Sequence, residues 1–255
     1  MPASDTLLST HSSRPGDLNG SEPWVLPLGR ASDGQRCLRD DWLFRRARAP
    51  TREVECELKG RGFTFAPNAR VCVSNLRAAA SLLATAPSLE GAVERSVGEV
   101  VLLVAPPGYD VSHSEPRWPE TVFISVPGEE GQVGALRTLE NVVHEAMHLQ
   151  LTTFEGSSPL VADCDARMLS PWRREHRDLR GVLHGAYVFR CISAFFQCKA
   201  LGEQLDAFGA KYTERRRREI ADELRMVDYD HLSCGLTLAG RDFLDALLRD
   251  HTWGL

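Results

Sequence analysis

Two histidines and a glutamate in the middle of the chain have the types and spacing of a metal site. His144, Glu145 and His148 form an H-E-x-x-H sequence inside an apolar run, 139–151. The apolar residues of this run recur at the period of a helix. Residues four positions apart share one face of a helix, so both imidazoles can reach the same cation. We therefore interpret the motif as a metal site rather than as two unrelated histidines beside a core helix.

A metal site needs a third protein ligand, and the identity of that ligand separates the families of H-E-x-x-H proteins. The metzincin extension requires a glycine at position 151 and a histidine at position 154, but the chain has Leu151 and Phe154, which excludes that subclass. A gluzincin supplies a glutamate from a following helix. We expect the chain to turn away from helix over 152–158, and no acidic residue soon downstream lies in an apolar helical pattern. These acidic residues are Glu155, Asp163, Asp165 and Glu175.

His184 is the third ligand that the sequence favours. It lies in a segment, 179–196, whose apolar spacing is typical of a buried helix. Gly181 and Gly185 flank it, and their missing side chains would let backbone or a ligand approach closely. A satisfied core histidine is the alternative, but a ligating pair upstream reverses the usual preference for it. His176, in an arginine-rich turn where exposure is expected, is the second choice.

The segment before His184 is rich in arginine. Its members are Arg173, Arg174, Arg177 and Arg180. If a helix begins near Arg177, then Arg177 and Arg180 fall close to the face that carries His184. A peptidase has no obvious need of guanidinium groups beside its zinc. A dicarboxylic cosubstrate bound to the metal does need them, because arginine binds a carboxylate through two hydrogen bonds.

Three histidine ligands would also suit the chemistry of an oxygenase. They leave three positions open on an octahedral Fe(II) ion, two for a chelating 2-oxo acid and one for dioxygen. The usual facial triad of non-haem iron oxygenases has a carboxylate in place of one histidine, so an all-histidine set departs from that pattern. Affinity trends alone would also admit zinc or copper, and the residues by themselves leave the metal open.

Three further stretches accompany the motif. It is preceded by V-F-I-S-V at 122–126 and followed by S-P-W-R at 170–173 and by G-V-L-H-G-A-Y-V-F at 181–189. Over about 97–248 the chain resembles the HExxH-motif peptide-modification proteins of ribosomal peptide natural-product clusters. The pairing of H-E-x-x-H with P-W-R and L-H-G is far more specific than H-E-x-x-H alone.

Members of that family look like Fe(II)- and 2-oxoglutarate-dependent peptide β-hydroxylases rather than proteases. The resemblance implies three iron ligands, which are His144, His148 and His184. It also implies that Arg173 or Arg177 holds the distal carboxylate of 2-oxoglutarate, and Arg180 completes the set of candidate cosubstrate residues. The family commonly has Arg-Pro before the L-H-G segment, whereas this chain has Arg177-Asp178, so the choice between the arginines stays open.

The favoured function is therefore Fe(II)- and 2-oxoglutarate-dependent hydroxylation of a side-chain β-carbon in a ribosomally synthesised precursor peptide, with dioxygen as the co-reactant. The alternative is a zinc-dependent peptidase or amidase, in which Glu145 is the general base that activates a metal-bound water. In an oxygenase Glu145 would instead orient a ligand or a water. A metal-stabilised binding protein without catalysis is a third hypothesis, from another class.

Composition argues against several other classes of protein. The chain has 255 residues and a formal net charge of -5, so there is no electrostatic case for nucleic-acid binding. Four consecutive arginines, 215–218, precede acidic residues closely, which is typical of a solvated helix face with local ion pairs. Seven scattered cysteines without a C-x-x-C pair favour a reducing cytoplasm. We expect neither a signal peptide nor a membrane-spanning stretch.

The expected fold class is α+β, mainly α-helical with a small β-sheet, and with a single metal site between two core helices. Residues 1–23 are expected to form a disordered tail and 24–255 a single catalytic domain. Strands are predicted over 97–105 and 121–126, joined by a polar loop whose His113 is expected at the surface or facing substrate. Helices are predicted near 38–44, over 69–97 with an interruption at Pro87, and over 139–151, 179–196, 211–227 and 237–248.

Overall fold

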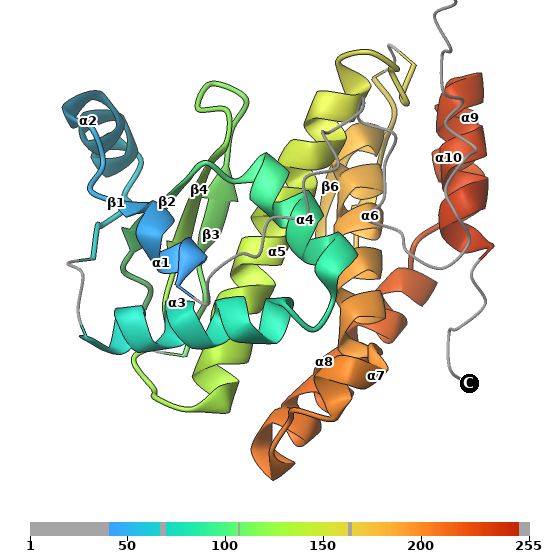
Figure 1. Ribbon diagram of the computed structural model, residues 1–255. Coiled ribbons are helices and arrows are strands. Elements are labelled where there is room, and N and C mark those ends of the chain that lie inside the picture. The colour runs from blue at the N-terminus through green and yellow to red at the C-terminus, as the bar shows by residue number, and fades with distance from the viewer. Residues whose placement is uncertain (1–40, 67–69, 107, 163–164, 250–255) are drawn as a thin grey trace, which may run out of the picture.

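The computed structural model describes residues 41–66, 70–106, 108–162 and 165–249. It is an α+β protein, mainly helical, with a four-stranded sheet and a separate two-stranded hairpin (Figure 1). The expected mixture of many helices and a small sheet is confirmed. The tail predicted over 1–23 lies outside the described residues, and so does the start of the short helix predicted near 38–44.

The larger sheet has the strand order β1-β2-β4-β3. Its strands are β1 (Ala47–Arg48), β2 (Glu99–Leu103), β3 (Ser112–Ser114) and β4 (Thr121–Ser125). β2 pairs in parallel with both β1 and β4, and β3 pairs antiparallel with β4. The predicted pairing of the two apolar strands is confirmed. β3 was not predicted, because its Ser-His-Ser sequence lacks the apolar alternation of a half-buried strand.

Helices surround this sheet and continue beyond it. Before β2 come α1 (Trp42–Arg46), α2 (Arg52–Gly60), α3 (Arg70–Leu83) and α4 (Pro87–Ser96). After β4 come α5 (Gln132–Glu155), the hairpin strands β5 (Arg167–Ser170) and β6 (Glu175–Asp178), and then α6 (Leu179–Phe196). The C-terminal part contains α7 (Lys199–Gly202), α8 (Ala207–Arg225), α9 (Tyr229–Cys234) and α10 (Leu238–Leu248). The predicted break at Pro87 is confirmed, since that proline opens α4 at a position where its missing N–H costs nothing.

The two faces of the sheet pack against different helices. Val100 and Val122 belong to the main core, which also contains the apolar sides of α3, α4, α5 and α6. Val101 and Phe123 point to the opposite face and join a smaller cluster with α2. Successive side chains of a strand alternate between the two faces of a sheet. Because β2 and β4 are buried on both faces, their sequences are continuous apolar runs. The sheet is therefore a layer between α2 and the main helical core.

Helix α5 is the central element of the main core. It is 24 residues long and packs against α3, α4, α6 and α8. The helix runs on to Glu155, so the prediction that the chain leaves helix at 152 is wrong by about one turn. Phe154 is buried in the core and holds that extra turn in place. α5 and α6 lie side by side in Figure 1, which brings the two histidine-bearing segments together.

The arginine run of α8 makes the expected ion pairs, and one of its arginines also contacts another helix. Arg215, Arg217 and Arg218 pair with glutamates of their own helix. Arg216 also contacts Glu219 of its own helix, but it points inward, and its Nε donates to Glu140 of α5 at 2.6 Å. None of the helices within the described ranges is long and apolar enough to cross a membrane.

Candidate functional site

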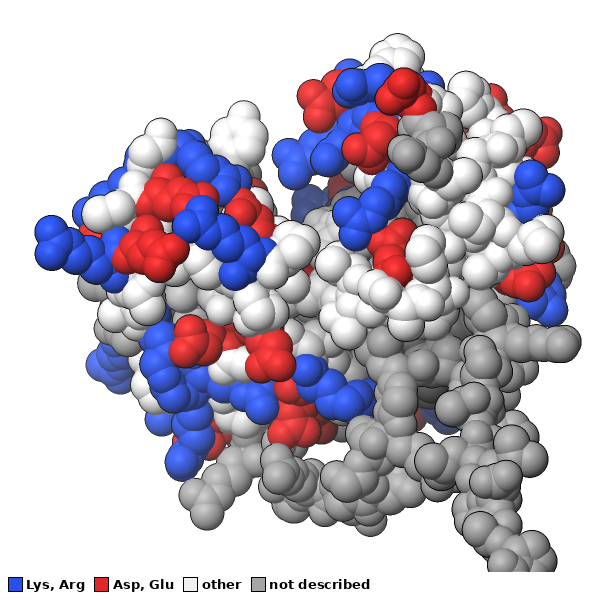
Figure 2. All heavy atoms as spheres, turned by 90° about the horizontal axis from the view of Figure 1, so that it is seen from above, with Lys and Arg blue, Asp and Glu red and all other residues white. Residues whose placement is uncertain are grey.

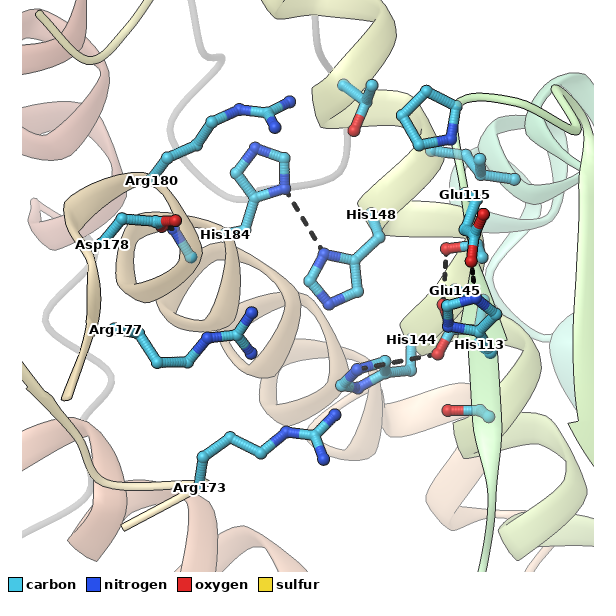
Figure 3. A pocket seen from close by; sticks show the side chains of 16 residues that line it. His113, Glu115, His144, Glu145, His148, Arg173, Arg177, Asp178, Arg180 and His184 are labelled. Carbon is cyan, nitrogen blue, oxygen red and sulfur yellow. Dashed lines mark hydrogen bonds and ion pairs between the residues drawn. The ribbon is translucent and has the colours of Figure 1, made fainter. Parts of the chain in front are cut away.

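A cavity of about 320 Å³ lies between β3, α5, the β5–β6 hairpin and the first turns of α6. Its wall contains every site residue predicted from the sequence (Figure 3): His144, Glu145, His148, Arg173, Arg177, Arg180 and His184. In the view from above, a hollow in the surface separates two lobes of the molecule (Figure 2). The fold thus brings residues from four separate segments to one place.

The motif residues project from α5 in two directions. His144 and His148, one turn apart, both face the cavity, and their ring centroids are 4.8 Å apart. Glu145 is 4% exposed and turns toward the sheet, where its Oε2 accepts a hydrogen bond of 2.5 Å from the hydroxyl of Ser114. Its other oxygen lies 3.9 Å from Nε2 of His144. A strand hydroxyl therefore fixes the carboxylate beside the histidine pair.

His184 faces the histidines of α5, as the sequence predicts. Its Nδ1 lies 3.4 Å from Nδ1 of His148, and the two rings are nearly parallel. His184 is 6% exposed, on a helix that is buried on almost every side. The second choice, His176, is exposed on β6 and does not line the cavity. His113 does line it, but its Nε2 lies 2.5 Å from a carboxylate oxygen of Glu115.

Glu155 is a site residue that the sequence analysis set aside. Its Oε2 accepts hydrogen bonds from Nε2 of His184 at 2.8 Å and from Nε of Arg180 at 2.7 Å. Burial raises the pKa of the Glu155 carboxyl, but these two hydrogen bonds outweigh burial and the pKa is lowered. The carboxylate thus fixes the His184 ring, with Nε2 turned toward Glu155 and Nδ1 turned toward His148. Position 155 is seven residues after His148, two helical turns on the same face, and this spacing was the available signal.

Burial keeps the two α5 histidines neutral. Desolvation, with the nearby charge of Arg173 as a second cause, lowers the pKa of His144 to about 4. Desolvation and then the neighbouring His144 lower the pKa of His148 to about 3. Both rings therefore carry a free nitrogen lone pair at neutral pH, which is the form that binds a metal.

No group of three or more His, Cys, Asp or Glu side chains in the described part of the chain is arranged as a metal site. The three histidines share the cavity, yet the metal centre expected between α5 and α6 stays a prediction. What the residues offer is a set of imidazole nitrogens, with the Glu155 carboxylate hydrogen-bonded to the ring of His184.

The arginines differ from one another in how they are held. Arg173, in the turn of the β5–β6 hairpin, and Arg177, on β6, extend toward the histidines (Figure 3). Neither forms an ion pair with any residue of the described ranges. Arg180 is bound to Glu155 instead. The helix predicted over 179–196 is confirmed as α6, and it does not begin near Arg177, because Asp178 caps it by accepting a hydrogen bond from the backbone N–H of Gly181.

An aromatic contact holds the hairpin against α6. The ring of Trp172 stacks on Phe189 with centroids 5.2 Å apart, and Phe189 in turn contacts the ring of His144 edge-on. A Cβ atom at Gly185 would lie 2.6 Å from the Trp172 ring. Gly185 was expected to admit backbone or a ligand, whereas the group that it admits is this indole. Trp172 of the P-W-R segment thus packs against Gly185 of the L-H-G segment.

No family model matches the chain, and no curated protein sequence matches it.

Proposed function

We propose that the chain is an Fe(II)- and 2-oxoglutarate-dependent oxygenase that hydroxylates a side-chain β-carbon of a ribosomally synthesised precursor peptide. The observation that carries this proposal is the lining of one cavity, in which two arginines without an acidic partner among the described residues face three histidines. The peptide as substrate, and the β-carbon as its target, rest on the family resemblance of the motifs.

Iron would be held by His144, His148 and His184. The 3.4 Å between Nδ1 of His148 and Nδ1 of His184 supports a shared cation. Two nitrogens that ligate one ion at about 2.1 Å stand roughly 3.0 Å apart in cis positions of an octahedral ion and roughly 3.4 Å apart on a tetrahedral one, so the separation suits a shared cation without distinguishing iron from zinc. As a hydrogen bond between two imidazole nitrogens the contact is long. The contact of Glu155 with the far nitrogen of His184 has the carboxylate–histidine arrangement that commonly supports a ligand.

Arg173 and Arg177 are the groups that would bind 2-oxoglutarate. Each extends its guanidinium into the cavity, and a guanidinium binds a carboxylate through two parallel hydrogen bonds. Arg173 is exposed and Arg177 is half-buried, and neither has an acidic partner among the described residues, so both guanidinium groups are available to bind an anion. A dianion matches this pair of charges, whereas hydrolysis of a neutral peptide supplies no anion. Arg180 is less suited to this role because Glu155 already occupies it.

When bound, iron and the 2-oxo acid supply the oxidising power, since one atom of dioxygen enters succinate as carbon dioxide is lost and the other atom is inserted into a substrate C–H bond. The chain's own residues position these reactants. Phe189 and Trp172 wall off one side of His144, and Glu145, held by Ser114, lies where it can orient a water or a polar group of the substrate.

The test is to reconstitute the full chain with Fe(II) without oxygen and measure binding of 2-oxoglutarate by calorimetry. Dioxygen and a precursor peptide encoded beside the gene are then added, and succinate and peptide mass are measured. We expect saturable 2-oxoglutarate binding that needs the metal, succinate, and a mass gain of one oxygen. Absence of both 2-oxoglutarate binding and succinate with Fe(II) and with every other divalent first-row metal would refute the proposal.

A zinc peptidase or amidase is a second candidate, because one observation favours it. The short hydrogen bond from Ser114 holds the buried carboxylate of Glu145 beside His144. A general base that activates a metal-bound water must lie beside the metal ligands in this way. In that case zinc-loaded protein would cleave the same peptide, and Glu145→Gln would abolish cleavage. Under the oxygenase proposal, Glu145→Gln retains 2-oxoglutarate binding.

A further inference from the structure

Strand β3 forms the edge of the sheet beside the cavity. In the order β1-β2-β4-β3, it has a neighbour on one side only among the strands of the described ranges. Five consecutive residues, 112–116, line the cavity. Side chains of a strand alternate between the two faces of a sheet, so an unbroken run of lining residues shows that the cavity borders the strand's edge and not one of its faces.

The register of β3 sets the direction of its backbone groups. Ser125 donates its backbone N–H to the carbonyl of Val111 at 2.7 Å, and His113 lies opposite Phe123 two positions further along. Hydrogen-bonded pairs alternate with non-bonded pairs in an antiparallel ladder. The N–H and C=O groups of Ser112 and Ser114 therefore point away from β4, toward the open edge. No hydrogen bond to these four groups occurs within the described ranges.

The side chains of β3 are fixed on both faces, which keeps its edge straight and exposed to the cavity. On one face the hydroxyl of Ser114 is bound to Glu145 of α5. On the other, the ring of His113 stacks on Phe63 at 5.6 Å and contacts Glu115. The strand can thus accept a neighbour without rearranging its own side chains.

Backbone groups, and not charged side chains, are what this edge presents to a partner. Ser112 and Ser114 are uncharged, and the acidic group that follows them, Glu115, is paired with Arg61. What the edge offers is a ladder of donors and acceptors two residues apart. A polypeptide backbone in extended conformation is the chemistry that matches such a ladder.

We propose that the substrate peptide binds as an added strand on β3, through backbone hydrogen bonds to Ser112 and Ser114. This inference rests on the proposed peptide substrate and adds how the substrate is held. Alternate side chains of the added strand would face the α5 side of the sheet, where Ser114 meets Glu145 beside the histidines. Backbone pairing would also leave the target side chain as the main determinant of selectivity.

A selected peptide provides the probe. Random dodecapeptides displayed on phage are panned on the full chain, and the tightest binder is synthesised with single N-methyl groups at each amide in turn. We expect affinity to fall about tenfold at every second amide and little between, since each loss removes one backbone hydrogen bond. On the protein side, Ser112→Pro removes the outward N–H, and we expect a similar loss, whereas Ser112→Ala keeps that N–H and should keep the affinity. Hydrogen exchange of 110–116 should slow when the peptide binds.

Three results would overturn the inference: no binder from the library, N-methyl losses without a two-residue period, or equal affinity of the proline and alanine variants with unchanged circular dichroism. A dimer formed by pairing of two β3 edges, seen by size-exclusion chromatography and abolished by Ser112→Pro alone, would overturn it as well. A periodic binder that gains no oxygen refutes only the proposed activity. Oxygen transfer to a peptide without the two-residue period refutes only the strand addition.

Discussion

The helical wall and the hairpin wall of the cavity are built in opposite ways. On the helical wall, contacts within the protein hold key polar groups in place, since Glu145 binds Ser114 and His184 binds Glu155. On the hairpin wall Arg173 and Arg177 extend into the cavity without an acidic partner among the described residues. The helical wall is therefore preorganised by its own contacts, and the hairpin wall presents positive charge that no described acidic residue compensates.

This difference separates two kinds of ligand. Preorganised neutral donors on packed helices suit a group that stays bound, because no rearrangement is needed to bind it. Uncompensated cations on a hairpin suit an anion that enters and leaves with each reaction cycle. Under the proposed function, changes on the helical wall should therefore alter metal content, and changes on the hairpin wall should alter cosubstrate affinity while metal content stays the same.

The largest effect is expected from His184→Ala. It removes one of three donors, and we expect stoichiometric iron binding to be lost while the helical circular dichroism spectrum is retained. His176→Ala is the matched control, since that histidine is exposed and lies outside the cavity. The metal content per chain, measured by mass spectrometry after desalting, tests whether His184 is a ligand. Iron retained at one per chain in His184→Ala would contradict the assignment of the third ligand.

On the hairpin wall, Arg173→Gln and Arg177→Gln should weaken 2-oxoglutarate. Loss of a hydrogen-bonded charge costs about 1.5–3 kcal/mol, so the dissociation constant should rise roughly ten- to a hundredfold for whichever arginine binds the distal carboxylate. Arg180→Gln serves as the control from the same segment, because its charge is already paired with Glu155. Calorimetry on the iron-loaded chain gives the constants. An effect confined to Arg180→Gln would reverse the roles that we propose.

The sequence predicted the histidines of the helical wall better than the position of the arginines on the hairpin wall. The histidine pair and its helix follow from local spacing, and His184 follows from the periodicity of α6 together with its flanking glycines. The strand that carries Arg177 could not be predicted locally, because β6 exists through its pairing with β5. The role of Glu155 depends on the packing of α5 against α6, and β3 exists through its pairing with β4. Contacts between distant segments decided each of these points.

A third prediction concerns Glu155→Gln on the helical wall. The amide oxygen can still accept one hydrogen bond, but the negative charge behind His184 is removed. Loss of such a supporting carboxylate typically reduces metal affinity about 10- to 100-fold, and for this conservative change we expect the lower end. Competition with a chelator of known affinity measures it. Unchanged metal affinity would show that Glu155 serves only to anchor Arg180.

The smallest effect is expected where the two walls meet, at Gly185. A methyl group there would lie 2.6 Å from the Trp172 ring, so Gly185→Ala must displace the indole and with it the hairpin turn that carries Arg173. Overpacking of this kind costs about 1–3 kcal/mol of unfolding free energy, measurable in urea. Gly202→Ala is the control, because open space surrounds that position and alanine favours helix. If the walls are coupled through this contact, Gly185→Ala weakens 2-oxoglutarate several-fold but leaves metal content unchanged, whereas loss of stability without any change in cosubstrate affinity would show that the hairpin positions its arginines without Trp172.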